Sequence, residues 1–256
     1  MVDVDGHSLY LSCAGTVSPT VVYVHGLTQG GDYVPHRATA PPRHRATAPI
    51  RELLADDFRV CLYDRRNSGD SDTVDAVQTP ADMLHDMESV LSKGGVEPPY
   101  ILMAASFGGL VAYDFLNHHP DQVSGLVLLD AIIPDELSLD QYLPPEATFQ
   151  YFSEDDKCCT TERVSGFDLI NGLQQYIGNE PDVPMIYLGA ALDPRVDYDW
   201  VTPEYAARYP GLLQRFVDRF TPGELRWVDA NHFMEPEVPD QIAQAVRDVA
   251  DMASTR

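Results

Sequence analysis

Ser106 is the residue whose surroundings most favour covalent chemistry. The apolar run at residues 100–105 is typical of a buried strand, and Gly108 and Gly109 closely follow the serine. This small-x-Ser-x-Gly order predicts a tight strand-to-helix turn that strains the serine and projects its hydroxyl from the sheet. Ala104 stands where such turns usually carry glycine. A serine that only caps a helix is the alternative interpretation of this stretch.

A serine hydroxyl becomes a strong nucleophile only when a base takes its proton and a third group orients that base. Downstream of Ser106, Asp193 lies in a loop after one apolar run and His232 lies shortly after another. We therefore predict Ser106 as nucleophile, Asp193 as acid and His232 as base. Asp130 also ends an apolar run and is the alternative acid. An aspartate at that position could instead accept backbone hydrogen bonds at a chain turn.

Acyl transfer also needs two N–H groups that stabilise the negative oxygen of its tetrahedral intermediate. The β-branched run at residues 20–24 leads directly into His25, Gly26 and Leu27. A strand that delivers His-Gly into a loop is a suitable source of one donor, and the residue after the nucleophile is the source of the other. We predict that the oxyanion hole consists of the backbone amides of Leu27 and Phe107.

Alternating strands and helices must position these residues. Residues 2–13 predict a β-hairpin that turns at Asp5-Gly6. Apolar runs and helical periodicity then predict strands at residues 20–24, 59–63, 100–105, 123–129, 185–188 and 224–228, and helices at residues 80–95, 107–119, 203–220 and 239–252. This alternation is typical of an α/β protein with a mostly parallel sheet.

The pattern loosens between residues 132 and 183, where prolines and scattered aromatic residues predominate. We interpret this segment as a small cap over the site, inserted between a first core part at residues 1–131 and a second at residues 184–256. The residues expected to line the substrate pocket are His25, Tyr142, Phe149, Phe152, Phe167 and Phe233. Aromatic residues that merely pack on one another are the alternative for the cap.

Composition restricts the partners. With a formal charge of −23 and a pI near 4.4, the protein is not expected to bind nucleic acid or an anionic membrane surface. Membrane insertion is not expected either, because no apolar run approaches the ~20 residues of a membrane span. We expect a small-molecule substrate, a monomer or homodimer, and a cytoplasmic location. The four cysteines show no metal spacing and do not suggest a disulfide framework. The hexapeptide HRATAP occurs at residues 36–41 and again at 44–49, which indicates a duplicated surface loop with an unassigned role.

The order of these motifs resembles the α/β-hydrolase fold superfamily over nearly the whole chain. The resemblance implies a serine hydrolase with a Ser-Asp-His triad that needs no metal or organic cofactor. It implies cleavage of a carboxylic ester, lactone or thioester of a small to medium apolar substrate, for which secondary metabolism is one expected source. A carbon–carbon hydrolase, lyase or cyclase on the same scaffold is the alternative, and a non-catalytic ligand receptor is a third interpretation.

Overall fold

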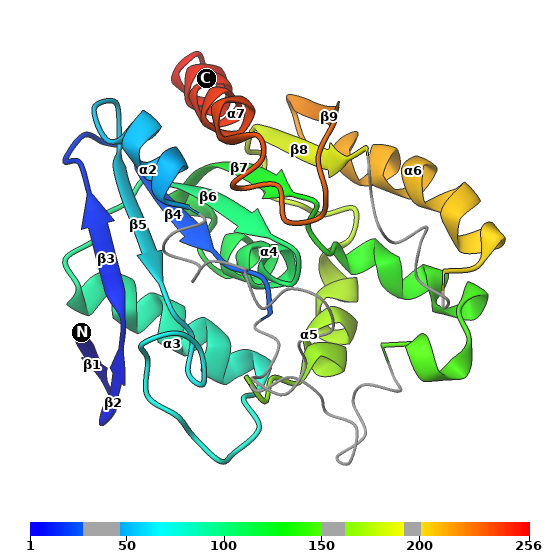
Figure 1. Ribbon diagram of the computed structural model, residues 1–256, viewed down its shortest axis with the longest axis horizontal. Helices are drawn as coiled ribbons and strands as arrows, with labels where there is room; N and C mark the ends of the chain where they lie inside the picture. The colour runs from blue at the N-terminus through cyan, green and yellow to red at the C-terminus, as the bar shows by residue number, and fades with distance from the viewer. Residues whose placement is uncertain (28–46, 150–161, 192–200) are drawn as a thin grey trace.

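The computed structural model describes residues 1–27, 47–149, 162–191 and 201–256 (Figure 1). A small antiparallel hairpin precedes a sheet of seven strands in the order β3-β5-β4-β6-β7-β8-β9. The hairpin pairs β1 (Val2–Val4) with β2 (His7–Leu9). Asp5 and Gly6 between them have φ angles of 53° and 86°. The predicted hairpin turn is confirmed, because a type I′ turn requires positive φ at both central residues.

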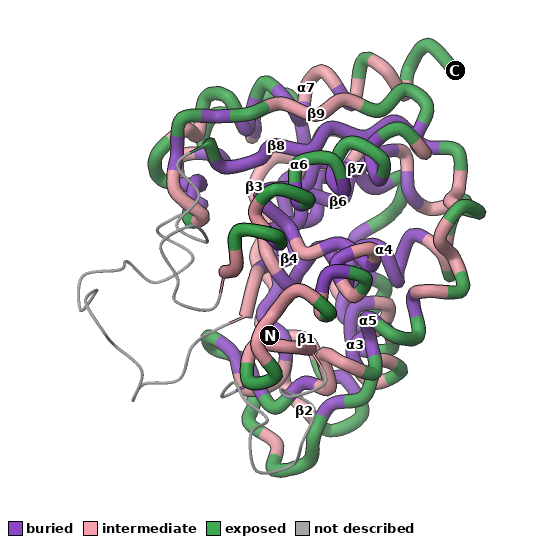
Figure 2. The backbone as a smooth tube through the Cα atoms, turned by 90° about the vertical axis from the view of Figure 1, so that its right-hand side faces the viewer, coloured by how far each residue is buried: buried purple, intermediate pink, exposed green. Residues whose placement is uncertain are grey.

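The large sheet is parallel except at β3, which runs antiparallel to β5. Its strands are β3 (Leu11–Ala14), β4 (Thr20–Val24), β5 (Arg59–Tyr63), β6 (Tyr100–Ala105), β7 (Val123–Leu129), β8 (Met185–Ala190) and β9 (Gly223–Val228). Every residue of β4, β6 and β8 is buried, and these strands lie inside the molecule in Figure 2. Strands covered on both faces explain the continuous apolar runs of the sequence.

Helices cover both faces of the sheet. They are α2 (Ala48–Leu54), α3 (Pro80–Lys93), α4 (Gly108–His118), α5 (Gly166–Leu173), α6 (Pro203–Val217) and α7 (Pro239–Ser254). Residues of α3, α4, α5 and α6 form one apolar core with one face of the sheet, and residues of α2 and α7 form a second core with the other. Along β4, Val22 and Val24 belong to the first core whereas Val21 and Tyr23 belong to the second, as strand alternation requires.

Helix α2 was not expected from the sequence, which suggests only a loop there. It begins inside the second copy of the repeated hexapeptide, with Thr47 as its buried N-terminal flanking residue. Its side chains Ile50 and Leu54 are fully buried in the core shared with α7. A helix of seven residues is too short to be stable alone, so this tertiary packing holds it in place.

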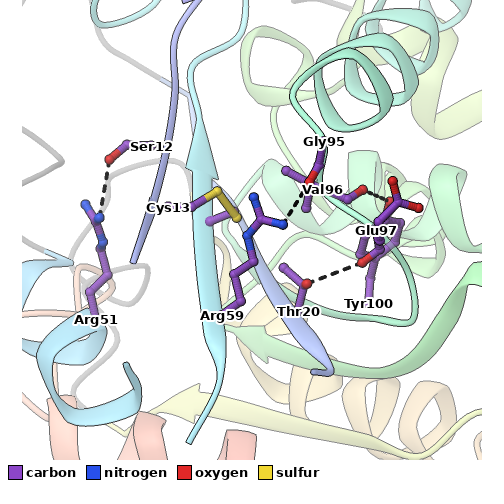
Figure 3. The surroundings of a disulfide bond; sticks show 10 residues. Ser12, Cys13, Thr20, Arg51, Arg59, Gly95, Val96, Glu97 and Tyr100 are labelled. Carbon is purple, nitrogen blue, oxygen red and sulfur yellow. Dashed lines mark hydrogen bonds between the residues drawn. A yellow bond between two sulfur atoms is a disulfide. The ribbon is translucent and has the colours of Figure 1, made fainter. Parts of the chain in front are cut away.

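Cys13 of β3 and Cys61 of β5 form a disulfide (Figure 3). The two residues are direct partners in the antiparallel register of these strands. The expectation of no disulfide is therefore wrong for this pair, since the spacing of cysteines does not reveal which of them face each other across strands. Disulfides persist mainly in oxidising compartments, so this bond gives no support to a cytoplasmic location. Cys158 and Cys159 lie outside the described residues.

The segment between β7 and β8 contains short helical turns and α5. Its 3₁₀ helices are η2 (Pro134–Tyr142), η3 (Pro145–Ala147) and η5 (Gln174–Tyr176), and a further one, η1 (Pro120–Gln122), precedes β7. Whether residues 132–183 act as a cap stays a prediction.

Among the helices that the structure describes, none combines the length and apolarity that a membrane span requires.

Candidate active site

The residues predicted for chemistry follow the carboxyl ends of parallel strands. Ser106 follows β6, Asp130 follows β7, His25 follows β4, and His232 lies a few residues after β9. Because β4, β6, β7, β8 and β9 are parallel, these ends meet at one edge of the sheet. Ligand sites of open α/β sheets form at this edge.

The turn that carries Ser106 is strained, as the sequence predicts. Ser106 has a φ of 51°, a left-handed conformation that is uncommon for a residue with a side chain. A Cβ atom at Gly108 would lie only 2.1 Å from the carbonyl oxygen of Val24, so α4 can begin here only with glycine. The Ser106 carbonyl accepts hydrogen bonds from the amides of Gly109 and Ile132, each at 2.9 Å. Close packing and these two bonds together hold the serine in its strained conformation.

The loop after β4 lies against the serine. A Cβ atom at Gly26 would be 2.9 Å from the Ser106 Cβ and 3.4 Å from its Oγ, which places the backbone of this loop beside the hydroxyl. Phe107 precedes the first residue of α4, and the first N–H groups of a helix have no acceptor within the helix. The amides of Leu27 and Phe107 are therefore on the two elements that border Ser106. Their convergence on one oxygen stays a prediction.

His232 is paired with Asp130. Its Nδ1 lies 2.6 Å from Asp130 Oδ2, and the carboxylate is fully buried whereas the imidazole is 22% exposed. The carboxylate accepts from Nδ1–H, so the neutral ring has its lone pair on Nε2. A histidine in this tautomer can accept a proton at Nε2, the nitrogen that points away from the carboxylate.

Asp130 is held by its own backbone contacts. It has a φ of 40°, so the strand ends in a left-handed residue just as β6 does at Ser106. Its Oδ1 accepts a hydrogen bond of 3.3 Å from the Ala190 amide, and its own amide donates to the Leu188 carbonyl. Asp130 thus accepts a backbone hydrogen bond, as one interpretation of the sequence suggests, and also binds His232.

Asp193, the acid predicted from the sequence, lies outside the described residues. The sequence alone could not distinguish Asp130 from it, because both follow apolar runs that become neighbouring strands, β7 and β8. Among the described residues, the hydrogen bond of His232 Nδ1 goes to Asp130.

A buried carboxylate and an exposed one support the loop that carries His232. Tyr23 of β4 donates a hydrogen bond of 2.6 Å to Glu235, a buried residue three positions after the histidine. Glu237 accepts from both the backbone amide and the side-chain amide of Asn231, at 3.0 and 2.8 Å. These contacts were not foreseen, because they connect residues of ordinary type that only the folded chain brings together.

A second ionic group lies behind the loop after β4. Arg65, two residues after β5, is 1% exposed and forms a salt bridge of 2.8 Å with the fully buried Glu162. Its guanidinium also donates to the carbonyls of His25 and Gly26. The sequence suggests only a compact turn after residue 63 and gives Arg65 no role.

His25 was expected to line the substrate pocket, but both of its ring nitrogens have partners within the protein. The Arg65 backbone amide donates to Nε2 at 3.3 Å, and Nδ1 lies 2.7 Å from the Gly26 carbonyl. A backbone N–H can only donate, so Nε2 accepts from Arg65, whereas Nδ1 faces both an acceptor, the Gly26 carbonyl, and a donor, Arg65 Nη2 at 2.9 Å. His25 is thereby held by contacts within the protein and supports the loop.

The other residues predicted for the pocket lie on several elements. Phe233 stacks edge-to-face on His232 at 5.3 Å and is 56% exposed, so it lies at the surface beside the histidine. Tyr142 and Phe149 are half-buried and pack against the apolar core, and Phe167 is half-buried on α5. Phe152 lies outside the described residues. Their role in substrate binding stays a prediction.

In the part of the chain that the structure describes, no group of three or more His, Cys, Asp or Glu side chains is placed to hold a metal ion.

Residues 19–157, more than half of the chain, match the family model described as alpha/beta hydrolase fold. A proline iminopeptidase of Arabidopsis thaliana is 26% identical over 191 residues, which are 73% of this chain and 46% of that protein. A thermophilic esterase from Thermogutta terrifontis superposes with a TM-score of 0.65 at 18% identity, over 98% of this chain and 96% of the other. The enol-lactonase from Burkholderia xenovorans gives 0.62 at 16% identity, over 97% and 98%.

The matched segments span less than half the length of the curated relatives, between 15% and 46%. The similar structures share less than a fifth of their residues with this chain, so they establish the fold and not the substrate.

Proposed function

The chain belongs to the alpha/beta hydrolase fold family, and from this premise we propose that it is a serine hydrolase of carboxylic esters, lactones or thioesters. The observation that carries the proposal is the pairing of two features at one edge of the sheet. One is the strained Ser106 with Gly26 beside it, and the other is the His232–Asp130 hydrogen bond. Strain at a serine and a buried carboxylate behind a histidine are the arrangement that acyl transfer requires.

In the proposed reaction, Ser106 Oγ attacks the carbonyl carbon while His232 Nε2 takes the hydroxyl proton. The tetrahedral oxyanion accepts hydrogen bonds from the amides of Leu27 and Phe107. Its collapse breaks the bond to the alcohol or thiol, which leaves with the proton from His232. Water then attacks the acyl-enzyme by the same steps, releases the acid and restores Ser106.

We assign the acid to Asp130 in place of Asp193. This assignment is supported by the 2.6 Å contact with Nδ1 and by the complete burial of the carboxylate. A carboxylate in that position holds the imidazole in the tautomer with a free Nε2 and stabilises the imidazolium formed during attack. The Ala190 amide fixes its other oxygen and therefore its orientation.

The apolar substrate and the ester-type bond are part of the proposal. An esterase and an enol-lactonase are among the proteins of similar fold, which is consistent with bonds next to a carbonyl. With serine at the turn, carboxylate-nucleophile chemistry is unsuitable, since it requires an aspartate at this position. Carbon–carbon bond cleavage and ligand reception remain alternatives that the following experiment separates.

The test is labelling with a fluorophosphonate, followed by mass spectrometry and by turnover of p-nitrophenyl esters of increasing acyl length. Wild-type protein should be labelled at Ser106 and should hydrolyse the esters, and Ser106→Ala should lose both properties. Ser124→Ala is the matched control, because Ser124 is a half-buried serine at the opposite end of the sheet, where it donates to the Tyr100 carbonyl. Folded wild-type protein that is neither labelled nor active would contradict the proposal.

A further inference from the structure

The guanidinium of Arg65 and the ring of His25 meet the backbone carbonyls of His25 and Gly26 on one side of the loop formed by residues 25–27. The guanidinium of Arg65 donates from Nη1 to the His25 carbonyl at 2.8 Å and from Nη2 to the Gly26 carbonyl at 3.0 Å. Nδ1 of the His25 ring lies 2.7 Å from the same Gly26 carbonyl and 2.9 Å from Arg65 Nη2. The Gly26 carbonyl therefore accepts a hydrogen bond from a guanidinium that also bonds the preceding carbonyl.

A trans peptide is planar, and its C=O and N–H point in opposite directions. The carbonyl of Gly26 and the amide of Leu27 belong to one such peptide. The Arg65 donor on the carbonyl therefore also fixes the direction of the Leu27 N–H, which must point away from Arg65. Rotating this peptide would break the hydrogen bond from Arg65 Nη2 and leave a donor of a guanidinium that is only 1% exposed without this acceptor, which is costly.

The position of Arg65 is itself fixed. Its Nε donates to Glu162, and both side chains are essentially without solvent contact. The guanidinium also lies over the ring of Phe107, 5.6 Å from its centroid. Phe107 and Leu27 are the two residues whose amides form the proposed oxyanion hole. Arg65 thus bonds the backbone of the loop that leads to Leu27 and lies over the side chain of Phe107.

Glu162 connects this group to the segment between β7 and β8. Its backbone carbonyl accepts hydrogen bonds from the side-chain amides of Asn67 and Gln78. Glu162 and Arg65 are 97 residues apart in the sequence. The salt bridge therefore links the segment after β7 to the loop after β4 through a single buried cation.

We propose that Arg65 is the positioning residue of the oxyanion hole, holding the Gly26–Leu27 peptide so that its N–H is directed to the reacting oxygen, with Glu162 as its buried counterion. The expected effect on kcat rests on the proposed function. The orientation of the Gly26–Leu27 peptide can be tested without it. The positioning role belongs to a charged pair that the hydrolytic steps themselves do not use.

Arg65→Met, Glu162→Gln and the double variant separate positioning from stability. Each single variant leaves one buried charge unpaired, so Tm should fall by roughly 10 °C in both. Only Arg65→Met removes the donors to the loop, so only it should lose kcat by about 100-fold, the cost of one misplaced oxyanion donor. The double variant should regain most of the Tm and none of the kcat.

Arg66→Met is the matched control. Arg66 is the adjacent residue and also pairs with a buried carboxylate, Asp86 at 2.5 Å, but its side chain makes no hydrogen bond to residues 25–27, the described part of the loop after β4. Its kcat should stay within about twofold of wild type. The affinity of an aryl trifluoromethyl ketone, which forms an oxyanion on Ser106, should weaken in Arg65→Met by the same factor as kcat/KM.

A double variant with a kcat within threefold of wild type would overturn the inference, as would Glu162→Gln that loses as much kcat as Arg65→Met. If wild-type protein proves inactive and is not labelled by fluorophosphonate, the proposed function fails. The positioning role of Arg65 is then tested by crystal structures of the variants. A rotated Gly26–Leu27 peptide in Arg65→Met, with the wild-type orientation in Arg66→Met, would support the positioning role. An unchanged peptide in both would overturn it.

Discussion

Replacing Asp130 by asparagine tests the assignment of the acid most directly. Asparagine is nearly the same size and tolerates the left-handed conformation that Asp130 adopts at φ 40°, so the fold should be kept. In the native protein the Ala190 amide donates to Oδ1, and Oδ2 accepts from His232. The oxygen of the asparagine amide should stay on the Ala190 amide, which leaves the NH₂ group facing Nδ1 of His232.

An NH₂ group at Nδ1 favours the tautomer that carries its hydrogen on Nε2, and such a ring cannot accept the proton of Ser106. Loss of the correct tautomer in a serine triad lowers kcat by about 10⁴-fold, which corresponds to about 5 kcal/mol of activation free energy. We therefore expect Asp130→Asn to lower kcat by 10²- to about 10⁴-fold with little change in KM.

The assay is kcat on one activated ester, with circular dichroism to confirm folding, and Asp193→Asn is the control. Asp193→Asn should retain most of the activity. The reasoning is refuted if Asp130→Asn keeps more than a tenth of the wild-type kcat while Asp193→Asn is crippled. In that case the 2.6 Å contact has a structural role, and the acid is the residue first predicted from the sequence.

Three further predictions concern stability. The Cys13–Cys61 disulfide joins residues 48 apart and restricts the unfolded chain, so reducing it should lower the free energy of unfolding by up to about 4 kcal/mol. Urea denaturation with and without reductant measures this change, and an unchanged midpoint would contradict the prediction. Deleting residues 42–49 joins the first HRATAP copy to Ile50, so that Ala40 and Pro41 take the places of Ala48 and Pro49 at the start of α2. Tm should therefore change by less than about 5 °C in calorimetry, and a larger drop would show that the second copy is needed. Burial raises the pKa of Asp114 to about 6, so the folded state favours the protonated acid and stability is lost as pH rises from about 4 to 6. Asp114→Asn should therefore raise Tm at pH 8 and have little effect at pH 4, and an equal effect at both values would exclude this cause.

The sequence by itself determined the order of the elements and the place of the serine. Strands at residues 20–24, 59–63 and 123–129 coincide with β4, β5 and β7, because strands buried on both faces need continuous apolar runs. The turn at Ser106 was predictable because only small neighbours fit where α4 packs on the end of β4. These features depend on local composition, which a single sequence displays directly.

Tertiary structure alone decided which distant residues meet. Asp130 and Asp193 both follow apolar runs, and the choice between them depends on how the loop after β9 reaches across the neighbouring strand end. The Arg65–Glu162 salt bridge joins residues 97 apart, and the Cys13–Cys61 disulfide follows from the register of β3 with β5. Such contacts form only when segments far apart in the sequence pack together. The type of a residue does not indicate which distant residue will become its partner.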